Sequence, residues 1–165
     1  MCYNKPVSFY KRRLPHWQPE GAALFVTWRL AGSIAATDEH PSTGPYHLQD
    51  EKLAGLVATA LRYGEKTLNL YRLRAWVIMP NHIHLLIEPS APIAEITSSI
   101  KRFTAARANK LLKLTGTPFW RDEFFDRWMR TKTEADNTVE YIEQNPVRAG
   151  LVRTPEDWPW SSAAE

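Results

Sequence analysis

Two histidines spaced two residues apart are the feature of this sequence best suited to chemistry. His82 and His84 lie in the apolar run MPNHIHLLI, residues 79–87, whose pattern predicts a buried β-strand. Side chains two apart on a strand point to the same face, so we expect the two imidazoles side by side. A divalent metal ion is a common partner for buried imidazoles, although ordinary hydrogen bonds would also satisfy them.

A second segment, VEYIEQNPVRAGLV at residues 139–152, carries a tyrosine and an amide at helical spacing. Tyr141 and Asn145 are four residues apart and would share one face of a helix. Asn145 precedes Pro146, which disfavours the α conformation, so we expect Asn145 at the helix end with its amide free to turn toward a site. Taken singly, Tyr141 is typical of a half-buried packing residue and Asn145 of a turn.

Together the two segments suggest one reaction. An imidazole pair on a strand can hold a hard divalent ion if an oxygen ligand, such as the amide of Asn145, completes the shell. A phenol beside that ion could attack a phosphodiester, forming a covalent phosphotyrosine and freeing a hydroxyl on the other fragment. The ion would polarise the phosphoryl oxygens.

Composition suits one cytoplasmic domain spanning residues 1–165. The chain is 44% hydrophobic and 24% charged, with a single cysteine, Cys2, so neither an internal disulfide nor a thiolate cage is expected. It contains no apolar run long enough to span a membrane and no signal-peptide pattern at its start. Residues 1–116 hold 15 Lys and Arg against 8 Asp and Glu, whereas the rest is acidic. The basic part favours a polyanionic partner, with a solvated helix face as the alternative.

The pattern of elements predicts an α+β fold. We expect strands at 24–30, 71–79 and 82–88, a fourth within 118–129, and helices at 48–68, 92–116 and from Thr133 to about residue 144. This order indicates a ferredoxin-like split βαβ sandwich with a central antiparallel sheet, in which the third strand is central. We divide the chain into a basic, irregular arm (1–20), the core (21–130), an extra C-terminal helix carrying the tyrosine (131–145) and a tail (146–165).

Local patterns add four details. Alternation would put Leu73, Ala75 and Val77 on one face of their strand. The second helix would end at Gly116, with Phe103, Leu111 and Leu114 in its core stripe, and Thr133 with Asp136 resembles a capping box. Pro146 would stop the last helix.

The two chemical segments resemble those of a known family. The block MPNHIHLL matches the HUH motif (histidine, hydrophobic, histidine) of single-tyrosine transposases, and YIEQNPVRAGL, residues 141–151, matches their tyrosine helix. The blocks FVTWRLAGS (25–33) and FWRDEFFDRW (119–128) resemble those of the REP-associated tyrosine transposases (RAYTs), a branch that acts on repetitive extragenic palindromes in bacterial chromosomes. The resemblance covers roughly residues 8–162.

This resemblance implies an HUH-type endonuclease and strand transferase that acts on single-stranded DNA bearing a hairpin and uses Mg²⁺ or Mn²⁺. By the same resemblance His82 and His84 are metal ligands and Tyr141 is the nucleophile that forms a 5′-phosphotyrosine. Many relatives place a glutamine four residues after the tyrosine as third ligand; here that position is Asn145, preceded by Gln144, while Glu88 shares the strand face of the histidines. A monomer or homodimer associated with the bacterial nucleoid is implied.

Basic and aromatic residues are the candidates for DNA contacts, because proteins hold single strands in basic grooves and by stacking bases on aromatic side chains. The candidates are Arg12, Arg13, His16 and Trp17 in the arm, Arg72 and Arg74 on the second strand, and Lys101, Arg102 and Lys110 on the second helix. Trp17 could instead pack, and Arg72 and Arg74 could merely solvate an edge. Two rival functions remain open: a palindrome-binding protein with little or no catalysis, and a hydrolase that activates water.

Overall fold

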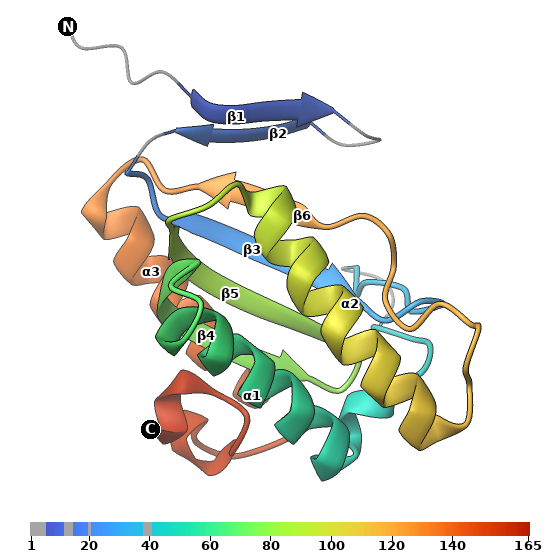
Figure 1. Ribbon diagram of the computed structural model, residues 1–165. Coiled ribbons are helices and arrows are strands. Elements are labelled where there is room, and N and C mark those ends of the chain that lie inside the picture. Colours follow the sequence, from blue (N-terminus) through green and yellow to red (C-terminus); the bar gives the residue numbers. More distant parts are fainter. Residues whose placement is uncertain (1–5, 12–14, 20, 38–40) are drawn as a thin grey trace, which may run out of the picture.

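A four-stranded antiparallel sheet organises the molecule (Figure 1). The computed structural model describes residues 6–11, 15–19, 21–37 and 41–165, and of the first two ranges only the backbone. The sheet has the order β4-β5-β3-β6, formed by Tyr71–Met79, His82–Pro89, Leu24–Arg29 and Phe125–Trp128. β5, which carries both histidines, therefore lies between β4 and β3. This arrangement confirms the predicted α+β class and its antiparallel sheet.

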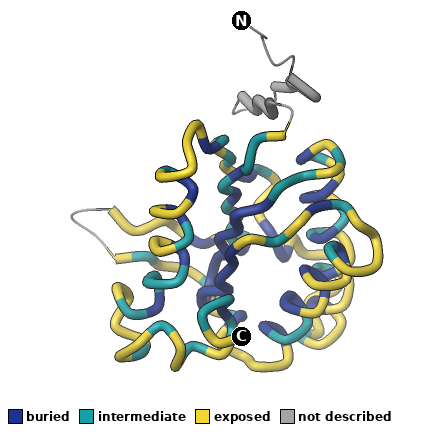
Figure 2. The backbone as a smooth tube through the Cα atoms, turned by 90° about the vertical axis from the view of Figure 1, so that its left-hand side faces the viewer, coloured by how far each residue is buried: buried dark blue, intermediate teal, exposed yellow. Residues whose placement is uncertain are grey.

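Two long helices cover one face of the sheet. α1 (Glu51–Lys66) and α2 (Ile93–Leu112) pack on alternate residues of the strands, and Trp28, Ile83 and Leu85 are almost fully buried there. Figure 2 shows the buried residues concentrated in the strand layer between exposed outer segments. The face of β5 opposite the histidines is thus a conventional apolar core, which fixes the strand and its side-chain alternation.

The other face of the sheet is covered by the C-terminal part of the chain. α3 (Lys132–Glu143) buries Ala135 and Ile142 against Val77, Leu86 and Met129. α3 follows β6 after only three residues, and α4 (Asn145–Arg148) continues from it after Gln144. The tyrosine helix is therefore held closely on the sheet of its own chain.

The C-terminal tail fastens this layer to β4. It contains short 3₁₀ helices at Pro155–Asp157 and Ser162–Ala164. Between them, the carbonyl of Trp160 accepts a 2.8 Å hydrogen bond from the amide of Ile78 in β4. Ser162 donates to Glu143 Oε1 at 2.9 Å. The tail thus binds both the outer strand and the end of α3. None of the described helices is long and apolar enough to cross a membrane.

Three local expectations are wrong at α2 and β4. α2 ends at Leu112, because Lys113 adopts the left-handed conformation (φ 58°) and closes the helix before Gly116. Phe103, Leu111 and Leu114 are exposed instead of buried. A β-bulge between Leu73 and Ala75 breaks the alternation, so Leu73 packs toward α1 and α2, whereas Ala75 and Val77 face α3.

The chain differs from expectation at three further places. Residues Pro6–Lys11 and Pro15–Pro19 form the antiparallel strands β1 and β2, not an irregular arm. α3 is capped by Thr131, whose hydroxyl accepts from the amide of Glu134 at 3.1 Å, so the cap precedes the predicted Thr133 by two residues. Pro146 lies within α4, where the first turn of a helix tolerates proline.

Candidate active site

Sheet register brings four polar side chains to one place on the face toward α3. His82 pairs with Arg29 and His84 with Thr27 across the β5–β3 ladder. Because Ile83 and Leu85 point into the core with α1 and α2, the two histidines and their cross-strand partners share the opposite face. His82 and His84 are 8% and 6% exposed.

Hydrogen bonds fix the orientation of both imidazoles. His82 Nδ1 lies 2.7 Å from Asn81 Oδ1, and the Asn81 amide in turn donates to Ser42 Oγ at 2.8 Å. His84 Nδ1 lies 2.6 Å from the Thr27 hydroxyl. The two Nε2 atoms face each other at 3.1 Å. Each ring is therefore held through Nδ1 and presents Nε2 to the same point, as the imidazoles of a metal site usually are.

Electrostatics keep both rings neutral. Burial lowers the pKa of His82 to about 2, with further lowering by His84 and by the positive charge of Arg29. Burial, followed by Arg29, lowers the pKa of His84 to about 3. A neutral imidazole has a nitrogen lone pair, so both groups are in the protonation state that a metal ion requires at neutral pH.

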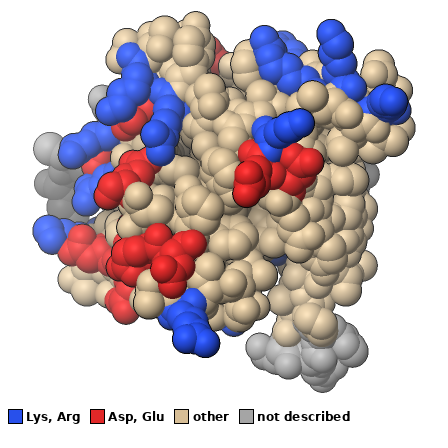
Figure 3. All heavy atoms as spheres, turned by 90° about the horizontal axis from the view of Figure 1, so that it is seen from below, with Lys and Arg blue, Asp and Glu red and all other residues tan. Residues whose placement is uncertain are grey.

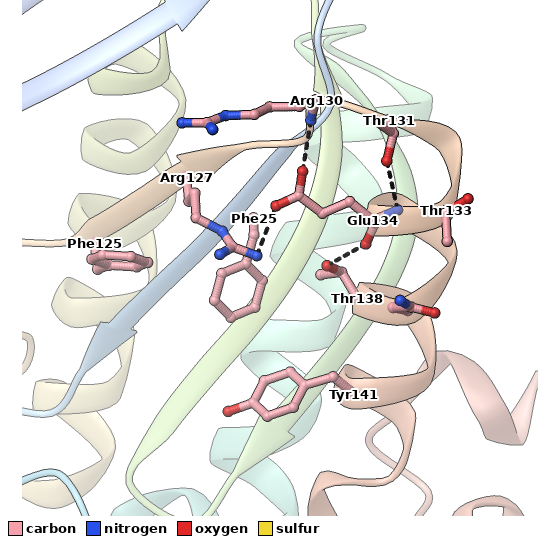
Figure 4. Close-up of a pocket in the computed structure, with 10 residues that line it drawn as sticks. Phe25, Phe125, Arg127, Arg130, Thr131, Thr133, Glu134, Thr138 and Tyr141 are labelled. Atoms are coloured by element: carbon pink, nitrogen blue, oxygen red, sulfur yellow. Dashed lines mark hydrogen bonds and ion pairs between the residues drawn. The ribbon is translucent and has the colours of Figure 1, made fainter.

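Tyr141 lies beside this pair. Its ring centroid is 5.6 Å from that of His84 and 5.9 Å from that of Phe25, which also stacks on His84 at 5.4 Å. Tyr141 is 39% exposed, so solvent reaches the phenol. In Figure 4 its ring projects from α3 toward β3 at one end of a pocket of about 780 Å³ that Phe25, Phe125 and Arg127 also line.

A second cavity, of about 720 Å³, joins the tyrosine to the histidines. Its lining includes His82, His84, Tyr141, Asn145 and Arg29. The Asn145 amide nitrogen is 3.4 Å from the Tyr141 carbonyl, whereas Gln144 forms the junction between α3 and α4 and does not line this cavity. Of the two amides, the structure therefore brings Asn145 to the histidine pair.

Glu88 is engaged elsewhere. Its carboxylate lies 2.8 Å from Arg74 Nη1 and 3.5 Å from Arg72 Nη1. No group of three or more His, Cys, Asp or Glu side chains gathers within the described ranges of the chain. Any ion held by His82 and His84 would draw its other ligands from amide, water or substrate oxygen.

The candidate DNA-binding residues are scattered. Arg12 and Arg13 lie outside the described residues, and of His16 and Trp17 only the backbone in β2 is described. The Lys101 ammonium donates to the carbonyls of residues 121, 122 and 123 at 2.9–3.2 Å, so it braces that loop. Arg102 and Lys110 are exposed on α2. On the face in Figure 3, basic side chains lie against acidic ones at the left and in the centre, and only the group at the upper right is basic alone.

Comparison with known proteins gives the family. The sequence model described as "Transposase IS200 like" matches residues 58–145, a span that includes both histidines and Tyr141. The chain belongs to the IS200-like transposase family. It is 30% identical over 96 residues to the REP-associated tyrosine transposase of Escherichia coli K12, a match covering 56% of this chain and 54% of that protein. A Haemophilus influenzae protein provisionally given the same name is 28% identical over 96 residues, covering 52% and 54%.

The solved structures agree with this assignment at the level of fold. A REP-associated tyrosine transposase bound to a REP hairpin aligns with a TM-score of 0.63 and 21% identity, over 94% of this chain and 82% of that one. The matches to the curated relatives span about half of their length. These findings confirm the resemblance to REP-associated tyrosine transposases expected from the motifs.

Three residues of the candidate site in this IS200-like family member were not identified from the sequence. Thr27 and Arg29 lie in the block FVTWRLAGS, and Asn81 in the block MPNHIHLL, but neither block reveals which strand pairs with which. Alternation along the strand could have pointed to them: Thr27 and Arg29 are the polar residues on one face of a strand whose other face carries Val26 and Trp28. A cation within a largely buried strand is itself a sign of a binding or catalytic role.

Proposed function

We propose that this chain is a metal-dependent single-stranded DNA endonuclease and strand transferase that acts on hairpin-forming repeats through a covalent 5′-phosphotyrosine. The observation that carries the proposal is the position of the Tyr141 ring, 5.6 Å from that of His84 and in the same cavity as both histidines. Family membership supports the reaction class, and the polarity of cleavage follows the family resemblance.

The histidine pair suits a divalent ion, for which Mg²⁺ and Mn²⁺ are the candidates. Two ligand atoms about 2.1 Å from one ion and at right angles to each other are about 3 Å apart, close to the 3.1 Å between the two Nε2 atoms. His82 and His84 would hold the ion, with the Asn145 oxygen as third protein ligand. When bound, it would neutralise charge on the phosphate and orient it.

The residues of the chain then have defined roles. The Tyr141 oxygen attacks the phosphorus, the new P–O bond to tyrosine forms, and the bond from phosphorus to the 3′ oxygen of the preceding nucleotide breaks, leaving a free 3′ hydroxyl. Solvent access to the half-exposed phenol provides a route for its proton. Phe125, 49% exposed beside this pocket, offers a stacking surface for a flanking base.

Several properties of the partner follow from this proposal. Single-stranded or hairpin DNA of the REP type is the proposed substrate, because the aligned structure is described as bound to a REP hairpin. Arg102 and Lys110, together with residues of the N-terminal segment, are the proposed phosphate contacts. A bacterial protein that acts on chromosomal repeats would work at the nucleoid in the cytoplasm.

The packing of α3 on the sheet of its own chain favours a monomer, in which Tyr141 serves the site of the same chain.

A covalent-adduct assay tests the proposal. An end-labelled synthetic strand, folded into a palindromic repeat from the genome that encodes this chain and flanked by single strands, is incubated with the protein and Mn²⁺. We expect denaturing electrophoresis to show a DNA fragment linked to protein. Cleavage without an adduct would favour water activation, and binding without cleavage would favour the alternative, a palindrome-binding protein.

The hydroxyl of Thr27 should tune the ion site. In Thr27→Val the side chain keeps its shape but loses the hydrogen bond that orients His84, so we expect Mn²⁺ affinity to fall about tenfold by calorimetry. Thr67→Val, an exposed position at the end of α1, is the matched control and should leave Mn²⁺ affinity unchanged. Equal affinities in Thr27→Val and the wild type would show that Thr27 does not support the site.

A further inference from the structure

Arg29 is a half-buried cation that forms no ion pair with any of the residues that the structure describes. Its Nη1 atom is buried and has no hydrogen-bond partner among the described residues. Burial lowers the pKa of Arg29, the nearby positive charge of Arg121 lowers it further, and Tyr141 raises it. An arginine remains charged even when its pKa falls, so this guanidinium is a fixed positive charge lacking a described partner.

The position of Arg29 relates it directly to the proposed reaction centre. It pairs with His82 across the β3–β5 ladder, on the face that holds both imidazoles. It lines the cavity that contains His82, His84 and Tyr141. It also lines a neighbouring cavity of about 450 Å³, whose other lining residues include Thr27, Phe125 and the acidic Asp122 and Glu123, neither of which forms a described ion pair with Arg29. A DNA strand that runs past Tyr141 from one cavity to the other would pass the guanidinium of Arg29.

An unpaired buried charge is costly, and an anionic ligand that pairs with it would remove that cost. A guanidinium presents a planar fork of N–H donors that matches two oxygens of one phosphate. The ion proposed at His82 and His84 would be a cation and cannot neutralise Arg29. The missing partner is therefore anionic, and the tyrosine that would attack phosphorus lies beside it.

We propose that Arg29 binds the non-bridging oxygens of the scissile phosphodiester and stabilises the negative charge that develops on them as Tyr141 attacks. This inference rests on the proposed function and adds a substrate-contacting residue to it. The guanidinium then acts from the β3 side of the phosphate, while His82 and His84 act from β5. Donors aimed at developing charge in a buried site have large effects on rate.

Three variants test this role. Arg29→Met should reduce the rate of adduct formation by about a hundredfold, and Arg29→Lys, which keeps the charge but loses the fork, should recover part of that loss. The melting temperature of Arg29→Met should equal or exceed that of the wild type, because the variant removes an uncompensated charge. Arg107→Met, an exposed arginine on α2, is the matched control and should keep the wild-type rate. A normal rate in Arg29→Met would overturn the proposal. So would a structural defect, in which Arg29→Met loses both rate and melting temperature and Arg29→Lys restores the melting temperature but not the rate.

A binding measurement separates failure of this inference from failure of the proposed function. On a Tyr141→Phe background, the synthetic hairpin strand carries one neutral methylphosphonate at each flanking linkage in turn, and anisotropy gives the affinity. We expect neutralisation of one linkage, the one that the wild type cleaves, to lower the affinity about tenfold. This loss should disappear in the Tyr141→Phe, Arg29→Met double variant. If the wild type forms no adduct, the proposed function fails, but the same pattern of affinities would still support Arg29 as a phosphate site. If no linkage loses its effect in the double variant, the inference is wrong.

Discussion

Replacing Tyr141 with phenylalanine should abolish the protein-linked DNA fragment while leaving hairpin binding within about threefold of the wild type. The substitution removes one oxygen and keeps the ring, which packs against Phe25 and His84. A covalent nucleophile has no substitute in its site, so we expect adduct formation to fall by at least about 10⁴-fold. Denaturing electrophoresis of the labelled strand measures the adduct, and anisotropy measures binding.

Tyr63→Phe is the matched control for this prediction. Tyr63 is 52% exposed on α1, on the other face of the sheet, so losing its hydroxyl should change neither adduct formation nor binding. A Tyr141→Phe protein that still cuts the strand at the wild-type rate would mean that water is the nucleophile and that Tyr141 only packs.

Loss of either histidine should remove metal binding and cleavage together. His82→Ala or His84→Ala deletes one of two nitrogens that converge at 3.1 Å, and a single neutral imidazole holds a hard divalent ion weakly. We expect Mn²⁺ affinity measured by calorimetry to fall by about a hundredfold or more, since losing a residue that merely orients a ligand already costs tenfold to a hundredfold. Cleavage at fixed Mn²⁺ should fall at least as far.

Two further variants keep this test interpretable. His84→Leu fills the buried site with a side chain that has no ligand atom, so normal folding of this variant without Mn²⁺ binding would separate lost ligation from lost packing. His47→Ala alters a half-buried histidine that stacks on Phe119 outside the cavity, and should bind Mn²⁺ normally. Unchanged Mn²⁺ affinity in both His82→Ala and His84→Ala would refute the assignment of these residues as ligands.

The sequence was sufficient for features that depend on local periodicity. The shared face of His82 and His84 follows from alternation along one strand, and β4 has the predicted limits because turn residues mark its end. The bulge at Leu73 was not predictable, because it depends on pairing with β5 and leaves no mark in the side-chain pattern. The end of α2 at Lys113 was missed because a non-glycine residue adopts the left-handed conformation there.

Contacts between segments that are distant in the sequence could not be predicted from periodicity. The proximity of Tyr141 to the histidines was inferred from the chemistry that the two segments could perform together, and the family resemblance supported it, because no local signal fixes which face of a sheet a late helix covers. Thr27 and Arg29 reach the site only through the register of β3 on β5, a pairing of segments more than fifty residues apart. Charge was an equally poor guide to Lys101, whose ammonium serves three backbone carbonyls around residue 122.

The attachment of α3 at both ends has a consequence for turnover. A link of three residues joins it to β6, and the tail fastens its last residue, Glu143, back to the sheet through Ser162. If Tyr141 carries a severed strand end, that end stays on a helix that is attached to the sheet at both ends, beside the place where the strand was cut. Exchange of one DNA end for another must then come from movement of the nucleic acid, and religation of the original ends competes directly with every transfer.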